Sequence, residues 1–134
     1  MDVNDKLVQI NVDTDIVTAR QEGRSLAAQL GFSSSEQVLI ATAISEAARN
    51  ILQYAGKGTI TLDSVEEGGR RGILIIARDA GPGISNIDQA MIDGYSSSGG
   101  LGLGLPGIKR LMNELEIISE AGKGTTLIMR RWKI

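Results

Sequence analysis

The chain has 134 residues, of which 42% are hydrophobic and 22% charged, and its formal net charge is −2. These values fit a single globular domain, and the charge lacks the basic excess of a sequence-independent nucleic-acid binder. Cysteine and histidine are both absent. Their absence excludes disulfides, thiolate metal sites, a cysteine nucleophile and a phosphohistidine relay. Any catalysis must therefore use carboxylates, amides, hydroxyls and backbone groups, and we expect residues 1–134 to form one domain.

The N-terminal residues 1–5 lack the basic and apolar stretches of a signal peptide. The longest apolar runs, such as residues 73–77, are too short to cross a bilayer. We therefore expect a cytoplasmic protein with neither a membrane nor a nucleic-acid partner.

The first part of the chain predicts one strand and two helices. Alternating apolar and polar residues predict a strand over residues 7–12. Asp13 follows as a predicted N-cap, and apolar residues at helical spacing continue to Gly31, where a left-handed residue would end the helix. Ser33 and Glu36 have the spacing of a capping box, which predicts a second helix that ends near residues 54–56.

The second part predicts two hairpins on either side of a glycine-rich region. Strands are expected at 59–65 and 72–78, and the apolar run 73–77 favours a central strand that is covered on both faces. We then expect a short helical piece at 87–92, a loop at 93–104, a helix at 106–115, and strands at 115–119 and 125–132. Hairpins with interleaved helices predict an α+β fold: a two-layer sandwich with a mixed, mostly antiparallel sheet and helices on one face.

Glycines alternate at Gly100, Gly102 and Gly104, directly before the predicted helix. Such a backbone can turn several N–H groups toward one ligand, and a following helix N-terminus favours an anion, so the pattern predicts a phosphate-binding loop. It is not a Walker A loop, because Ile108 occupies the position of the required lysine. A dinucleotide-binding motif is disfavoured because no predicted strand precedes these glycines.

Asp79, Gly81 and Gly83 follow the most apolar predicted strand. The carboxylate can accept a hydrogen bond from an exocyclic amine, while the glycines let a flat base approach the backbone. The alternative is an ordinary turn, for which Asp, Gly and Pro are the commonest residues. Gly122, Gly124 and Thr125 are by themselves equally typical of a hairpin turn.

Glu46 and Asn50 are four residues apart on the second predicted helix and share a face. A carboxylate suits proton abstraction, and an amide oxygen is a hard ligand for Mg²⁺. The alternative is a polar pair at the edge of the helix. Helical geometry points Arg49 about 100° away from their direction, so we expect it to be a surface or substrate contact. Lys109 and Arg110 are expected on the solvated surface.

Four groups of residues, taken in chain order, resemble the sequence boxes of the GHKL superfamily, which contains gyrase, Hsp90, histidine kinases and MutL. The groups are Glu46-x-x-x-Asn50, Asp79-x-Gly81-x-Gly83, Gly100-x-Gly102-x-Gly104 and Gly122-x-Gly124-Thr125. The resemblance covers about residues 36–130. It implies a GHKL-type sandwich that binds ATP and Mg²⁺.

The resemblance also implies a role for each site residue. Glu46 would be the catalytic base, Asn50 would hold Mg²⁺, and Asp79 would bind the adenine amine. The adenine would lie against Gly81 and Gly83 with support from Thr125. Residues 93–104 would form the ATP lid, in which Gly100, Gly102 and Gly104 contact the phosphates.

Size narrows the choice within the superfamily. A gyrase, Hsp90 or MutL subunit carries a further domain, for which we expect no room here, and the chain has no phosphoacceptor histidine. Residues 43–50, 54–58 and 100–112 resemble the anti-sigma-factor type of serine/threonine kinase, in particular the switch kinases of bacterial stressosomes. That resemblance implies STAS-domain scaffold and antagonist proteins as substrates, and a partner phosphatase that the released kinase activates.

Two alternatives to the kinase remain. One is an ATP-dependent anti-sigma factor that sequesters a sigma factor, since it would use the same pocket. The other is a nucleotide-independent scaffold, which the intact Glu46, Asn50 and Asp79 disfavour.

Overall fold

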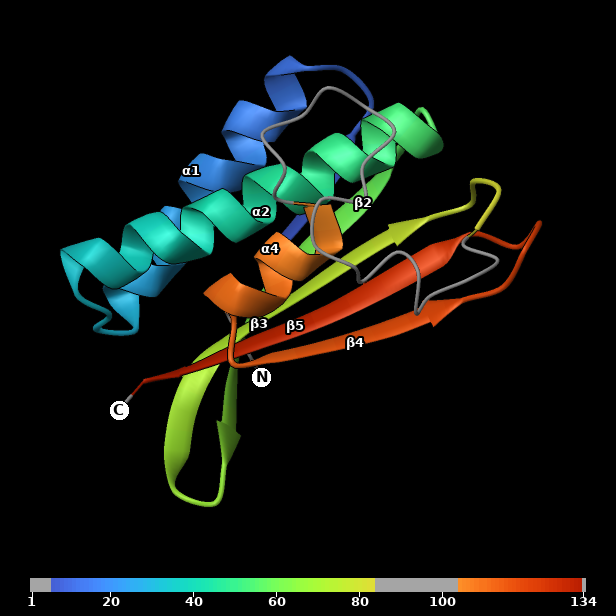
Figure 1. The fold of residues 1–134 in the computed structure, drawn as a ribbon. Helices are drawn as coiled ribbons and strands as arrows, with labels where there is room; N and C mark the ends of the chain where they lie inside the picture. Colours follow the sequence, from blue (N-terminus) through green and yellow to red (C-terminus); the bar gives the residue numbers. More distant parts are fainter. Residues whose placement is uncertain (1–5, 84–103, 134) are drawn as a thin grey trace.

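The computed structural model of the protein describes residues 6–83 and 104–133. Three helices in this part of the chain lie on one face of a five-stranded sheet (Figure 1). The elements in chain order are β1 (Lys6–Ile10), α1 (Thr14–Gln29), α2 (Ser34–Tyr54), β2 (Gly58–Glu67), β3 (Arg70–Asp79), α4 (Gly104–Leu111), β4 (Glu114–Ser119) and β5 (Thr125–Lys133).

The strands of the sheet lie in the order β1-β2-β3-β5-β4. The last strand of the chain, β5, therefore lies inside the sheet between β3 and β4, and β4 is an edge strand. α1 and α2 pack on the β1–β2–β3 side, and α4 packs against α2 and β4. The α+β sandwich with helices on one face is confirmed. Every pairing between the described strands is antiparallel, where the sequence suggested a mixed sheet.

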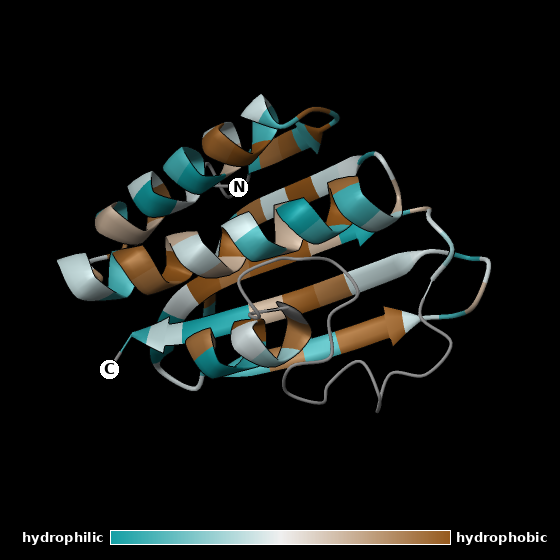
Figure 2. Cartoon of the chain, turned by 45° about the horizontal axis from the view of Figure 1, so that its top comes forward, coloured by the Kyte–Doolittle hydropathy of each residue, from teal (hydrophilic) through white to brown (hydrophobic). Residues whose placement is uncertain are grey.

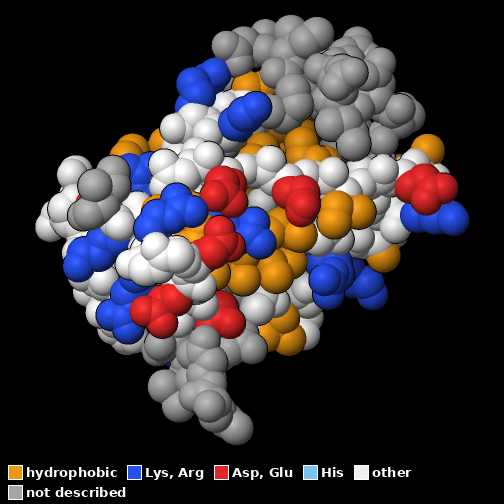
Figure 3. Space-filling view, turned by 90° about the horizontal axis from the view of Figure 1, so that it is seen from below, with side chains coloured by type: hydrophobic (Ala, Val, Ile, Leu, Met, Phe, Trp, Pro, Cys, Tyr) orange, Lys and Arg blue, Asp and Glu red, His pale blue; other side chains and the backbone are white. Residues whose placement is uncertain are grey.

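The core lies between the helices and the inner face of the sheet (Figure 2). Successive strand residues alternate between the two faces, so Ile73 and Ile75 are fully buried under the helices while Leu74 and Ile76 face outward. The outward residues are half-buried, and Figure 3 shows hydrophobic side chains in the middle of this uncovered face, surrounded by charged ones. β3 is therefore central, as predicted, but helices cover it on one face rather than two.

The helix ends follow the sequence signals with one exception. Gly31 has a φ of 92° after the end of α1, and the Ser33–Glu36 capping box is complete, as predicted. Asp13 occupies the N-cap position of α1, but its side chain makes no capping hydrogen bond. Asp15 instead accepts hydrogen bonds from the backbone N–H groups of Asn11 and Val12, at 2.8 and 3.0 Å. The carboxylate that stabilises the start of α1 therefore belongs to a residue of its first turn, and it fixes the loop that precedes the helix.

The last helix is shorter at its C-terminus than the predicted 106–115, because α4 ends at Leu111. Asn113 accepts a hydrogen bond from the backbone N–H of Trp132 at 2.6 Å, and Leu115 pairs with Met129 across the β4–β5 ladder. Because of these contacts with β5, the chain after Leu111 forms the strand β4 instead of continuing the helix. The predicted helical piece at 87–92 and the loop up to residue 103 lie outside the described residues. In the described part, no helix combines the length and apolarity needed to cross a membrane.

Candidate functional site

The sheet register brings two of the predicted boxes together. Asp79 is the last residue of β3, Thr125 is the first residue of β5, and the two are direct partners across the ladder. The C-terminal end of α2 lies beside them, because Gly81 approaches Tyr54 and Ala55. The candidate site therefore lies at the end of the sheet where β3 stops and β5 starts.

Asp79 is half-buried, and its Oδ1 accepts the backbone N–H of Gly81 at 2.9 Å. This hydrogen bond closes an Asx turn, so the turn that the sequence offered as an alternative does exist. Within the described residues no hydrogen bond reaches the second oxygen, Oδ2. The turn thus fixes the carboxylate and leaves one acceptor for a ligand.

The glycines around Asp79 permit close backbone contacts. A Cβ on Gly81 would lie 2.7 Å from Ala55 Cβ and 3.1 Å from the Tyr54 carbonyl oxygen. Gly83 has a φ of 75°, and the backbone N–H of Gly122 donates to the Pro82 carbonyl at 2.6 Å. The loop after β3 is thereby held between α2 and the β4–β5 turn. Packing requires Gly81 whether or not a flat base lies against it.

Thr125 hydrogen-bonds to Ser119 across the last hairpin, with 2.9 Å between the two hydroxyl oxygens. Ser119 also donates to the Gly124 carbonyl at 3.0 Å. No pattern in the sequence singled out Ser119. Only the register of β4 on β5, which places it opposite Thr125, reveals its role in holding that side chain.

Glu46 and Asn50 lie on α2. Glu46 is 7% exposed and Asn50 is half-buried, so the predicted base stands at the edge of the core rather than on a solvated surface. Arg49 forms an ion pair with Glu46 through Nη1 and Oε2. Arg49 is exposed, as expected for a surface contact, and its side chain nevertheless reaches back to Glu46. Residues three apart on a helix lie only about 60° from one another, which the long arginine side chain spans.

α4 begins at Gly104, while Gly100 and Gly102 lie outside the described residues. Leu105 and Ile108 are buried and attach α4 to the core. Lys109 and Arg110 are exposed, as predicted.

The C-terminal end of α4 is fixed by Arg131. Its Nη1 donates to the Leu111 carbonyl at 2.7 Å, and its Nη2 lies 3.7 Å from a Glu36 carboxylate oxygen. One arginine of β5 thus connects α4 with the start of α2. The helix that follows the predicted lid is held at its far end.

The acidic residues do not by themselves form a metal centre. Across residues 6–83 and 104–133, no cluster of three or more acidic side chains could hold a metal ion. The Asn50 side chain makes no hydrogen bond in that part of the chain, so its amide oxygen is available as a ligand. Mg²⁺ commonly combines one or two protein oxygens with water and substrate phosphates. Asn50 fits that pattern once a nucleotide supplies the phosphates.

Comparison with known proteins identifies relatives along nearly the whole chain. A family model described as "Histidine kinase-, DNA gyrase B-, and HSP90-like ATPase" matches residues 35–133, a range that contains all four boxes. "Serine/threonine-protein kinase RsbT" from Bacillus subtilis (strain 168) is 54% identical over 125 residues, which are 93% of this chain and 94% of that protein. An "Anti-sigma F factor" from Clostridium kluyveri is 35% identical over 119 residues, 84% of this chain and 82% of the relative.

A solved structure supports the fold. The histidine kinase domain from the Erythrobacter litoralis EL346 blue-light activated histidine kinase aligns with a TM-score of 0.51 and 18% identity. The alignment covers 89% of this chain, which spans 59% of that one. At this identity the likeness concerns the fold alone, and it confirms the predicted GHKL-type sandwich.

Proposed function

Because this chain belongs to the histidine kinase-, DNA gyrase B- and HSP90-like ATPase family, we propose that it is a serine/threonine protein kinase. It transfers the γ-phosphate of ATP to the hydroxyl of a protein substrate. The observation that supports this most is the near full-length similarity to a curated kinase of that specificity. The proposal includes one domain over residues 1–134 and a cytoplasmic location, where ATP and the substrate proteins meet.

Glu46 acts as the general base in this proposal. The substrate hydroxyl oxygen attacks the γ-phosphorus, the bond from that phosphorus to the bridging oxygen breaks, and ADP leaves. The hydroxyl proton passes to the Glu46 carboxylate. Phosphoryl transfer depends mainly on positioning and charge stabilisation, so a carboxylate on a packed helix is sufficient and histidine is not needed.

The other site residues bind the nucleotide. Asp79 accepts a hydrogen bond from the adenine amine through Oδ2, while its Oδ1 continues to accept the backbone N–H of Gly81. The base lies against Gly81 and Gly83, Thr125 supports it, and Gly100, Gly102 and Gly104 donate N–H groups to the phosphates. Asn50 would hold Mg²⁺ through its amide oxygen, and such an ion neutralises charge on the transferring phosphoryl group.

The substrates in this proposal are STAS-domain scaffold and antagonist proteins of a stressosome, and the released kinase activates a partner phosphatase. These assignments are supported by the resemblance to switch kinases. The second candidate is an ATP-dependent anti-sigma factor that sequesters a sigma factor. The similarity to anti-sigma F factors favours it, although at lower identity.

The test measures transfer of radiolabelled γ-phosphate from Mg·ATP to purified STAS-domain proteins. Wild type should label a serine or threonine, whereas Glu46→Gln should transfer about 10²–10⁴-fold more slowly, the usual contribution of general base catalysis. ATP affinity should remain the same in both. Glu116→Gln, which replaces an exposed glutamate of β4, is the matched control and should behave as wild type.

The other outcomes separate the candidates. No labelling with ATP still bound, together with capture of a sigma factor, would favour the anti-sigma factor. Failure of the wild type to bind ATP would contradict both candidates.

A further inference from the structure

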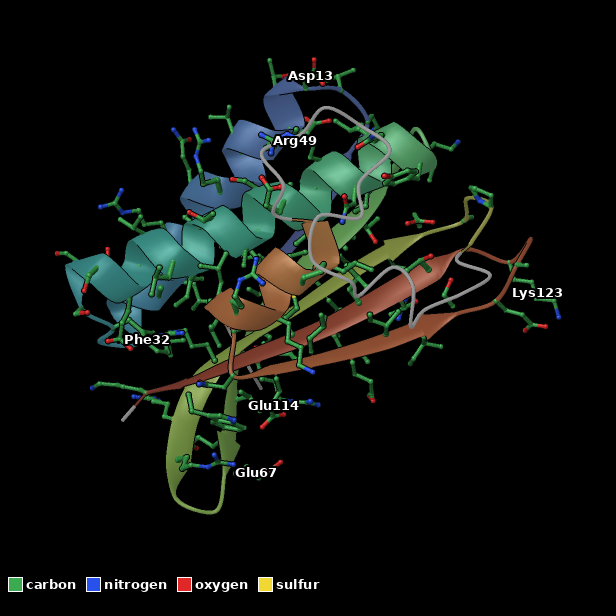
Figure 4. The ribbon with its side chains drawn as sticks, in the orientation of Figure 1. Asp13, Phe32, Arg49, Glu67, Glu114 and Lys123 are labelled. Atoms are coloured by element: carbon green, nitrogen blue, oxygen red, sulfur yellow. The ribbon has the colours of Figure 1, made fainter. Side chains whose placement is uncertain are left out.

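Three polar side chains form a row across the end of the sheet where the nucleotide is proposed to bind. Asp79 of β3 pairs with Thr125 of β5, and Thr125 pairs in turn with Ser119 of β4. Directly paired residues project from the same face, and Asp79 comes two residues after the buried Ala77, so this face is the inner one. Figure 4 marks this end of the sheet by Lys123, which lies in the turn between β4 and β5.

The hydrogen bonds in this row fix the direction in which Thr125 donates. Ser119 Oγ lies 3.0 Å from the Gly124 carbonyl oxygen, which can only accept, so Ser119 gives its single hydroxyl hydrogen to that carbonyl. Ser119 Oγ also lies 2.9 Å from Thr125 Oγ1. Because the Ser119 hydrogen is already used, Thr125 must be the donor in this second bond. The Thr125 hydroxyl hydrogen therefore points to Ser119, and Oγ1 offers only lone pairs to a ligand.

A ligand at this end of the sheet thus meets two neighbouring hydrogen-bond acceptors. Asp79 uses Oδ1 for the N–H of Gly81 and leaves Oδ2 open. Thr125 is half-buried, and its hydroxyl has no hydrogen-bond partner besides Ser119 among residues 6–83 and 104–133. A water bound between the two would donate both of its hydrogens to them, and it too would only accept from the base. The pair therefore favours a donor, with or without such a water.

Purine bases differ in what they present to this pair. Adenine carries an exocyclic amine at position 6, which donates, whereas guanine carries a carbonyl oxygen there, which accepts. Hypoxanthine, the base of inosine, carries the same carbonyl oxygen. A 6-oxo purine would place that oxygen against two acceptors with no hydrogen between them, and a site that is built to accept from an N–H group strongly rejects a ligand that lacks it.

We propose that Ser119 is a positioning residue that makes the nucleotide site selective for 6-amino purines. It holds the Thr125 hydrogen away from the ligand, so that Thr125 adds a second acceptor to that of Asp79. Without Ser119, the Thr125 hydroxyl can rotate and donate to a 6-oxo group. This role rests on the proposed function, in which the site binds ATP, and Ser119 performs it through Thr125.

The test compares ATP with inosine triphosphate, which has a carbonyl oxygen in place of the 6-amine and a hydrogen on N1. Isothermal titration of the whole chain in the presence of Mg²⁺ gives the ratio of the two affinities. Ser119→Ala should lower the preference for ATP by about tenfold, as expected when one hydrogen bond to the 6-oxo group becomes possible. Ser119→Thr keeps the hydroxyl and should keep the preference. Thr126→Val, which removes the neighbouring hydroxyl on the opposite face of β5, is the matched control and should bind both nucleotides as wild type.

A double variant separates this role from a purely structural one. Thr125→Val removes one of the two acceptors and should by itself lower the preference for ATP. It also leaves no hydroxyl hydrogen for Ser119 to hold, so adding Ser119→Ala to Thr125→Val should not change the preference further. A structural Ser119 would instead weaken both nucleotides equally, whichever residue occupies position 125. If Ser119→Ala is too unstable to titrate, the preference of Thr125→Val still tests the pair of acceptors.

Each outcome decides between these roles. A wild-type preference in Ser119→Ala, or equal effects of Ser119→Ala in the presence and absence of the Thr125 hydroxyl, would overturn the role of Ser119. Equal binding of ATP and inosine triphosphate by the wild type would overturn the pair of acceptors. A wild type that prefers ATP but transfers no phosphate to a protein would contradict the kinase and leave the base selectivity in place, whereas a wild type that binds neither nucleotide would contradict both.

Discussion

The two ends of the β3–β5 strand pair are built in opposite ways. At one end, large side chains hold the strands together. Trp132 is 5% exposed, its Nε1 donates to Glu114 Oε2 at 2.8 Å, and the Arg70 guanidinium lies 4.1 Å from its ring centroid. At the other end, Asp79 and Thr125 are flanked by glycines, and the contacts there are mainly between backbone atoms.

This difference separates stability from binding. The tryptophan end buries apolar area and fills its own space, so its contribution to folding needs no ligand. At the glycine end, backbone segments approach one another too closely for side chains, and in the proposed function this end binds the nucleotide. Substitutions at the two ends should therefore act on different quantities: the free energy of unfolding at one end and ATP affinity at the other.

The largest effect is expected for Trp132→Ala. Truncation of a buried tryptophan should lower the free energy of unfolding by about 3–5 kcal/mol, measured by urea denaturation. ATP affinity of the folded protein at low temperature should stay at the wild-type value. Trp132→Phe should lose less, since it keeps most of the apolar contact and gives up the hydrogen bond to Glu114. A fall in ATP affinity with either variant would show that the two ends are coupled.

Asp79→Asn should produce the reverse pattern. The Asn oxygen can still accept the Gly81 N–H, so stability should change by less than about 0.5 kcal/mol. The nitrogen that replaces Oδ2 cannot accept a hydrogen bond from the adenine amine, and ATP affinity should fall by roughly 1.5–3 kcal/mol, or about 10- to 150-fold. Isothermal titration measures the affinity, with Asp63→Asn in β2 as a control that should bind ATP normally. Normal affinity in Asp79→Asn would refute the adenine assignment.

Thr125→Val tests whether the hydroxyl at the glycine end matters more for binding or for folding. Its loss removes the hydrogen bond to Ser119, which should reduce stability by about 0.5–1.5 kcal/mol. If Thr125 supports the adenine as proposed, ATP affinity should also fall about fivefold, and Thr125→Ser should restore both. A loss of stability with unchanged affinity would reduce Thr125 to a residue of the hairpin.

The sequence predicted most of the fold because its signals are local. Apolar periodicity located each described helix and strand to within a few residues, and the Ser33–Glu36 capping box gave the start of α2. The errors have non-local causes. α4 stops at Leu111 because Asn113 and Leu115 engage β5, a strand that lies beyond them in the chain. No pattern in the apolar run of β3 tells whether one or two of its faces are covered.

The candidate site was predictable residue by residue but not as an arrangement. The resemblance to the GHKL boxes singled out Asp79 and Thr125, while only the β3–β5 register places them opposite one another. The sequence predicted that Gly81 lets a flat base approach the backbone, whereas its close contact with Ala55 follows only from tertiary packing. For Arg49, the angle of about 100° on the helix holds relative to Asn50. It does not take into account that a long arginine side chain can reach Glu46, three positions earlier.

The smallest effect concerns Glu114 at the tryptophan end. The hydrogen bond from Trp132 is the main cause that holds the pKa of this carboxyl below its usual value, with help from Arg130 and Arg70 and against the effect of desolvation. A lowered pKa in the folded state means that folding favours the charged form. The resulting stability is present above the usual pKa of a glutamate and is lost as the pH falls through the lowered value.

Glu114→Gln should remove that dependence. Its amide oxygen can still accept the Trp132 N–H, but it does not titrate, so the urea midpoints of variant and wild type should differ at neutral pH and approach one another in acid. The difference should be small, because the Glu114 side chain is 43% exposed and solvent screens its charges. Glu116→Gln, on the same strand and exposed, should keep the wild-type dependence. If the curves for Glu114→Gln and wild type stay parallel into acid, the tryptophan end owes its stability to packing alone, and the contrast with the glycine end is one of buried area rather than of charge.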